Sequence, residues 1–200
     1  MEKILRLNMG ADGGPAFKEE PLGDYAGLGG RAMTSGIVSK EVPPLCHPLG
    51  EDNKLVIAPG LLSGSTAAMS GRLSVGCKSP LTGGIKEANS GGQGAQVMGR
   101  LGYAAIVLEG KPTDDRLYKI IINKDGVTIE PADELKGLGN YATVEKLSAK
   151  YGQKVACITI GQAGEMKMSA ASVAFTDVEQ RPTRHAGRGA THIGNRGAAI

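Results

Sequence analysis

The sequence predicts an α+β fold built from mixed β-sheets with a few helices. About eight strand-like segments stand against three helical ones, and the strands come in hairpin-like groups instead of alternating strictly with helices. The 200 residues contain no stretch of linker composition, and a residue-by-residue comparison finds no internal repeat. We therefore expect a single compact domain over residues 1–200.

The predicted strands are segments in which apolar and polar residues alternate, or in which apolar and β-branched residues run together. They are residues 4–8, 54–58, 72–77, 104–109, 117–123, 127–130, 155–160 and 168–175. The turn formed by Lys124, Asp125 and Gly126 indicates a hairpin between the fifth and the sixth.

Three further segments have the apolar spacing and the end signals of helices. They are residues 31–42, 93–101 and 141–151. Pro43 and Pro44 end the first helix, and Gly102 and Gly152 end the other two. The long stretch at residues 78–92 is expected to be a loop.

Glycine dominates the composition, with 31 glycines in 200 residues, more than twice the usual share of about 7%. A collagen-like G-X-Y period is absent, and the apolar share of 40% excludes wholesale disorder. So many glycines indicate tight turns, or places where the backbone approaches a ligand closely. There is no Trp, and five Tyr and two Phe offer little stacking surface, so a nucleic-acid partner is not expected.

The compartment is predicted from what the sequence lacks. No apolar run approaches the roughly 18 residues of a membrane span, and the first six residues, MEKILR, are not the start of a secretion signal. We expect a cytoplasmic protein with no membrane partner. Cys46, Cys77 and Cys157 are far apart and form no C-x-x-C motif, which favours buried apolar thiols over metal or cluster ligands.

The net charge of +3 is concentrated at one end of the sequence. The last twenty residues contain no acidic side chain and four arginines, Arg181, Arg184, Arg188 and Arg196. Their charge of +4 leaves the other 180 residues at −1. This asymmetry favours a local anionic ligand over a generally basic surface.

Three segments could bind such an anion. Arg72 begins a strand after a loop of small residues, and residues 89–92 (NSGG) offer backbone N–H groups just before a helix. Arg184 and Arg188, four residues apart in a segment that contains Gly187 and Gly189, suit bidentate recognition of a phosphate.

Each segment also has a plainer interpretation. An isolated arginine can be a solvated surface residue, residues 89–92 can be a turn with a helix cap, and an arginine–glycine tail can bind nucleic acid. His47 lies between Cys46 and Pro48 in a loop, where a metal-binding role is not favoured. His185 and His192 have no neighbouring carboxylate or thiol in the sequence that could complete a metal site. Neither G-x-G-x-x-G, a Walker loop, a nucleophile elbow nor H-E-x-x-H occurs.

The order of several short motifs resembles one known family. The motifs are residues 48–55 (PLGEDNKL), 70–72 (SGR), 78–84 (KSPLTGG), 89–92 (NSGG), 102–103 (GY), 105–107 (AIV), 109–111 (EGK), 164–165 (GE) and 186–189 (AGRG). Together they resemble the N-terminal domain of the tungsten-containing aldehyde:ferredoxin oxidoreductases over nearly the whole chain.

The resemblance implies a domain of two mixed sheets that holds a bis-molybdopterin cofactor with tungsten or molybdenum, and a magnesium ion that bridges the two pterin phosphates. Arg72 matches the arginine between the pterin and an iron–sulfur cluster, and Asn89 and Gly91 match pterin-site residues, with Asn89 on the magnesium side. The second binding segment is matched by Arg184, His185, Gly187 and Arg188. Two dianionic phosphates call for arginine forks, backbone N–H groups and a hard cation, which is consistent with this assignment.

Two features depart from the family pattern. The cysteines that hold the family's 4Fe–4S cluster lie in later domains, so the cluster is expected in a partner chain or in further domains, with ferredoxin as an indirect partner. After Arg188 the sequence differs from the usual continuation, and His185 replaces a small residue. A domain that normally packs on others is also expected to form a homo- or hetero-oligomer.

Three functional hypotheses follow. The first is a cofactor-binding domain or subunit of an aldehyde-oxidising, ferredoxin-linked oxidoreductase that is not active alone. The second is a pterin-binding carrier or regulatory module without catalysis. The third is a decayed, structural homologue, which would include a nucleic-acid role for the arginine tail.

Overall fold

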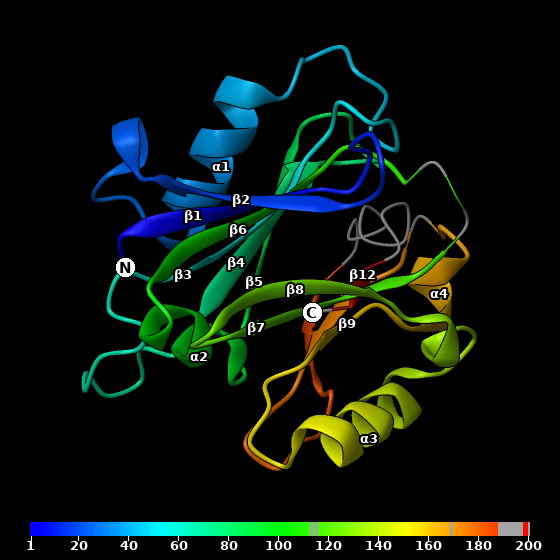
Figure 1. Cartoon of the computed structure of the whole chain (residues 1–200). Coiled ribbons are helices and arrows are strands. Elements are labelled where there is room, and N and C mark those ends of the chain that lie inside the picture. The colour runs from blue at the N-terminus through cyan, green and yellow to red at the C-terminus, as the bar shows by residue number, and fades with distance from the viewer. Residues whose placement is uncertain (113, 115, 169, 188–197, 200) are drawn as a thin grey trace.

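A computed structural model describes every residue except 113, 115, 169, 188–197 and 200 (Figure 1). Its largest layer is a six-stranded sheet in the order β2-β1-β6-β3-β4-β5. The strands are β1 (Lys3–Asn8), β2 (Ala16–Pro21), β3 (Leu55–Pro59), β4 (Leu73–Lys78), β5 (Ile85–Ser90) and β6 (Tyr103–Glu109). The pair β1–β6 is parallel and the other pairs are antiparallel, so the predicted mixed α+β fold is confirmed.

Helix α1 (Gly30–Glu41) covers one face of this sheet (Figure 1). Its apolar stripe, including Met33 and Ile37, packs on side chains such as Val56 and Val107. At the centre of this contact a Cβ on Gly76 would lie only 2.6 Å from the Cβ of Thr34. A glycine in β4 therefore lets the helix approach the strand directly.

The second part of the chain forms two three-stranded sheets, in the orders β12-β7-β8 and β11-β10-β9. The strands are β7 (Tyr118–Asn123), β8 (Gly126–Pro131), β9 (Ile158–Thr159), β10 (Val173–Phe175), β11 (Arg184–Ala186) and β12 (Ala198–Ala199). The remaining helices are α2 (Gly94–Arg100), α3 (Asn140–Tyr151), α4 (Gly161–Glu165) and the 3-10 helices η1 (Gly23–Tyr25) and η2 (Asp133–Leu135).

The second half repeats the topology of the first. Strand β12 lies against β9, so its strands follow the order β8-β7-β12-β9-β10-β11, which matches β2-β1-β6-β3-β4-β5 strand for strand. In each half an antiparallel hairpin leads into a 3-10 helix and then a 12-residue α-helix. The expectation that the chain holds no internal repeat was therefore wrong.

The repeat is also visible in the sequence once the register is known. Residues 16–41 align with residues 126–151 without a gap, at a constant shift of 110. The identical pairs are Glu20/Glu130, Pro21/Pro131, Gly27/Gly137, Leu28/Leu138, Gly29/Gly139, Ala32/Ala142 and Lys40/Lys150. The other aligned positions differ in residue type, although α1 and α3 bury the same four aligned positions, residues 33, 34, 37 and 38 and residues 143, 144, 147 and 148.

One apolar core joins the halves. It contains Leu73 and Ile106 from the first half and Ile120, Ile158 and Phe175 from the second. The edge strands β5 and β11 lie beside each other, and the backbone N–H of Gln93 donates to the carbonyl of Thr176 at 2.8 Å. We call this contact, with β5 and residues 92–93 on one side and Thr176 and β11 on the other, the seam.

Several predicted boundaries were wrong. Residues 78–92 are not all loop, since they contain β5, and β2, β11 and α4 were not predicted. β2 and β5 are edge strands with polar, partly exposed residues, so they lack the apolar signal of the inner strands. The predicted strands at 155–160 and 168–175 shrink to β9 and β10.

Among the described residues, no helix has the length and apolar character needed to cross a bilayer.

Candidate cofactor site

The first predicted binding segment is assembled at one end of β4 and β5. Arg72 directly precedes β4, and its Nε donates to the side-chain oxygen of Asn89 on β5. The Nδ2 of Asn89 donates in turn to the carbonyl of Leu73 at 3.0 Å, which fixes the amide orientation. Both terminal nitrogens of Arg72 have no partner among the described residues. The guanidinium is thus held by one nitrogen and can offer two to an anion.

The glycines after β5 keep this end of the strand open. A Cβ on Gly91 would lie 3.7 Å from Nη1 of Arg72, and a Cβ on Gly92 would lie 2.7 Å from the carbonyl oxygen of Thr176. Gly92 also has a φ of +105°, a conformation that side chains rarely adopt. Gly92 therefore permits the close contact across the seam, whereas a Cβ on Gly91 would make an ordinary van der Waals contact with the guanidinium of Arg72.

The second predicted segment lies on β11. Arg184 and His185 are exposed residues of this strand, and Gly187 follows it. Nδ1 of His185 and Oγ of Ser172 are 2.8 Å apart. Arg188 lies outside the described residues. Because β11 lies beside β5, the fold brings the two predicted segments to one seam.

The duplicated topology places these residues at equivalent positions. Asn89 pairs with Ser74 across β4–β5, as His185 pairs with Ala174 across β10–β11. Gly91 and Gly187 then correspond, each two residues further on. When Asn89 is matched with His185 on this shared spacing to a glycine, Ser172 takes the position of Arg72. Sequence reasoning did not single out Ser172.

The donor set suits an anionic, flat ligand better than a directly bound metal ion. The side-chain oxygen of Asn89 already accepts from a guanidinium, and that positive charge disfavours a cation on the same atom. No group of three or more His, Cys, Asp or Glu side chains in the described ranges could hold a metal ion. The free arginine nitrogens and the bare glycine backbone fit phosphate groups and a planar ring system.

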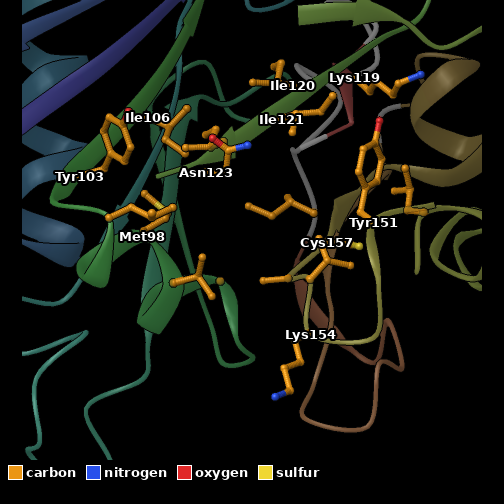
Figure 2. Close-up of a pocket in the computed structure, with 18 residues that line it drawn as sticks. Met98, Tyr103, Ile106, Lys119, Ile120, Ile121, Asn123, Tyr151, Lys154 and Cys157 are labelled. Carbon is orange, nitrogen blue, oxygen red and sulfur yellow. The ribbon is translucent and has the colours of Figure 1, made fainter. Parts of the chain in front are cut away.

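A separate cavity of about 360 Å³ lies between the halves (Figure 2). Met98 and Ile106 line one side, and Ile121, Tyr151 and Cys157 line the other. Burial raises the pKa of the Cys157 thiol to about 11, which makes it a poor nucleophile or ligand near neutral pH. None of the six predicted binding residues that the structure describes lines this cavity.

Comparison with known proteins identifies the family of this fold. The model of the aldehyde ferredoxin oxidoreductase N-terminal domain matches residues 4–194. The chain belongs to this family. The resemblance drawn from the short motifs is thereby confirmed.

The curated relatives of this family member are longer proteins. A tungsten-containing aldehyde ferredoxin oxidoreductase of Pyrococcus horikoshii is 39% identical over 191 residues, covering 94% of this chain and 30% of the relative. That of Thermococcus kodakarensis is 37% identical over 175 residues, covering 86% of this chain and 28% of the relative. The chain therefore spans about 30% of the length of the curated relatives it matches.

A solved structure shares the whole fold. It is the active-site complex of a benzoyl-coenzyme A reductase bound to 1,5-dienoyl-CoA, with a TM-score of 0.84 and 28% sequence identity. The match covers 100% of this chain and 30% of that one. The same fold is thus present in relatives that are named for different substrates.

Proposed function

We propose that residues 1–200 form the domain of an oxidoreductase that holds a bis-molybdopterin cofactor with tungsten or molybdenum. The observation that carries the proposal is the meeting of the two predicted segments at the seam, where Arg72 presents two unpartnered nitrogens beside Gly91. The names of the curated relatives support tungsten.

Arg72 and Arg184 would hold the cofactor through its anionic phosphates, since a guanidinium fork matches the oxygen geometry of that group. Gly91 and Gly187 would let the backbone lie against a flat ring, because neither carries a side chain. The magnesium ion that the family resemblance implies would be held by the cofactor phosphates near Asn89, but not by the side-chain oxygen of Asn89, which already accepts from Arg72. When bound, the metal centre would supply the exchange of electrons and of an oxygen atom with the substrate.

The favoured reaction is oxidation of an aldehyde to a carboxylic acid, which consumes one water and releases two protons and two electrons. This chain would position the cofactor, while a 4Fe–4S cluster in a partner chain or in further domains would pass the electrons to ferredoxin. The described cysteines agree with that division, because Cys77 and Cys157 are buried and belong to no group of metal ligands. A cytoplasmic location fits a ferredoxin-linked enzyme.

A reductase that acts on the ring of an aromatic acyl-CoA is a second candidate. It is favoured by the TM-score of 0.84 over the whole chain with the benzoyl-coenzyme A reductase complex. Both candidates use the same cofactor site, so they differ in substrate and in the direction of electron flow. The assembled complex, assayed with aldehydes and with aryl-CoA thioesters, distinguishes them.

The test of the cofactor site is the tungsten, molybdenum and pterin content of the chain purified from its native host. Near-stoichiometric metal and pterin are expected, with a large loss in Arg72→Gln and in Arg184→Gln. Arg100→Gln removes the same charge from an exposed helix residue outside the site and should load normally. Wild-type protein without pterin, in cells that load other tungsten enzymes, would contradict the proposal and favour the structural homologue. Pterin that exchanges freely with no metal would favour the carrier or regulatory module.

A further inference from the structure

Two residues of β5 each accept a hydrogen bond from the Nε of an arginine. Asn89 accepts from Nε of Arg72, and Glu87 accepts from Nε of Arg31 at 3.1 Å. In both arginines the terminal nitrogens have no partner within the described part of the chain. Glu87 and Asn89 are two residues apart and therefore lie on the same face of β5, separated by about 7 Å.

A buried serine connects the two acceptors. Oγ of Ser74 donates to Glu87 at 2.6 Å, and Nδ2 of Asn89 lies 3.5 Å from the same oxygen. Ser74 is 2% exposed and the Glu87 side chain 13%, so little water competes for these contacts. The polar groups run without a break from Arg31 through Glu87, Ser74 and Asn89 to Arg72.

The position of Arg31 follows from the way α1 begins. Gly30, which has a φ of +52°, is the first residue of α1, and a Cβ on it would lie 3.8 Å from Oγ of Ser74. The first turn of α1 therefore lies over β4 and β5, and Arg31 reaches Glu87 from above the sheet. Its side chain remains 75% exposed, so its free nitrogens face solvent.

The second half keeps this topology without the arginines. Tyr141 and Ser172 stand at the positions of Arg31 and Arg72, and Thr183 stands at that of Glu87. The fold therefore does not need two arginines that are hydrogen-bonded to an edge strand. Their presence in the first half calls for a function at that place.

We propose that Arg31 contacts the same anion as Arg72, and that Glu87 is a positioning residue that orients both guanidinium groups. The ligand is a phosphoryl or diphosphate group, which two guanidinium groups held by neighbouring acceptors on one face of β5 can bind from two sides. Together Arg31, Arg72 and Glu87 carry a net charge of +1, so the place attracts anions although it contains a carboxylate. The inference rests on the proposed function, in which the cofactor phosphates are the ligand.

The test of Arg31 is a titration of the 200-residue chain with inorganic pyrophosphate by calorimetry, at low ionic strength. Arg31→Gln is expected to weaken binding tenfold or more, and its matched control, Arg100→Gln, less than twofold. Equal losses in both variants would show that only overall charge matters and would overturn the assignment of Arg31.

The role of Glu87 is tested by whether Glu87→Gln strengthens or weakens pyrophosphate binding. Glu87→Gln makes the site more positive, so simple charge attraction demands tighter pyrophosphate binding. A positioning role demands weaker binding, by about tenfold, because the amide no longer holds Arg31 and Ser74 as a carboxylate does. Ser74→Ala, which cuts the connection without changing charge, should weaken binding as well. Binding by Glu87→Gln as tight as wild type, or tighter, would overturn the positioning role.

Glu145→Gln, on the exposed face of α3, is the matched control for the loss of a carboxylate. Thermal unfolding of each variant shows whether it is folded. Pterin and metal content separate this inference from the proposed function. If wild-type protein binds neither pterin nor pyrophosphate, both fail. If wild type, Arg31→Gln and Glu87→Gln all load pterin and bind pyrophosphate equally, only the inference fails.

Discussion

The cluster around Glu41, at the end of α1, should dominate the acid sensitivity of the fold. Arg6 donates to both oxygens of Glu41, at 2.7 and 2.8 Å, and the hydroxyl of Tyr25 donates at 2.8 Å. Lys54 lies 3.1 Å from the same carboxylate. Burial alone raises the pKa of Glu41, but the hydrogen bonds from these three groups outweigh it and lower the pKa to about 2.

The size of the effect follows from that pKa. A fall from the ordinary 4.5 to about 2 corresponds to about 3 kcal/mol of stability at neutral pH. Because the folded-state pKa is the lower one, this contribution is complete above the unfolded pKa of 4.5. It disappears as the pH falls through about 2. Glu41→Gln should therefore reduce the free energy of unfolding by about 2–3 kcal/mol at pH 7, since Arg6 keeps Glu20 and Glu109 as partners.

Urea unfolding of wild type and Glu41→Gln between pH 7 and pH 2 measures the difference, and subtraction cancels the other carboxylates. We expect the difference in free energy of unfolding between the two proteins to be largest above pH 5 and nearly absent at pH 2. At neutral pH it should lower the melting temperature by about 5–10 °C. Glu145→Gln, exposed on α3, should show no gap. A gap that does not change with pH, or one below about 0.5 kcal/mol at pH 7, would refute this reasoning.

Two other experiments test the seam and the cavity. Gly92→Ala should destabilise the fold by about 2–4 kcal/mol in thermal unfolding, through its φ of +105° and the contact with Thr176. The control is Gly13→Ala, which has a φ of +88° but open space around it and should lose only about 1 kcal/mol of stability. Equal losses of stability in Gly92→Ala and Gly13→Ala would show that the seam contact is not tight. The Cys157 thiol, with a pKa of about 11, should react with a disulfide reagent at pH 7 far more slowly than the half-buried Cys46; comparable rates would mean that the cavity opens readily.

The elements that could be predicted from the sequence are those with apolar faces. The four inner strands of the six-stranded sheet and all three predicted helices occur close to their expected positions, because burial imposes a period of 2 or 3.6 on the residues. β2 and β5 were missed since an edge strand can be polar, as the sequence IKEANS of β5 shows. The repeat was missed because its halves share backbone positions more than residue types.

The candidate site divides in a similar way. Arg72, Asn89 and Gly91 could be named in advance because short motifs carry them, and pairing across β4 and β5 then brings them together. Arg31 and Glu87 are 56 residues apart, and no local pattern connects them. Their contact depends on how α1 lies on the sheet, which is decided by tertiary packing.

The duplicated strand order has a consequence for the origin and the selectivity of this chain. Joining two copies of a half-length gene would produce this arrangement, with β5 and β11 where two identical subunits once met. An ancestral pocket on that symmetry axis would accept a ligand in either of two opposite orientations. Arg31 and Arg72 on one wall, with Tyr141 and Ser172 at the matching places on the other, remove that equivalence. A molecule bound between two sides of different charge has one preferred orientation, so a domain that arose in this way would bind its ligand in one direction only.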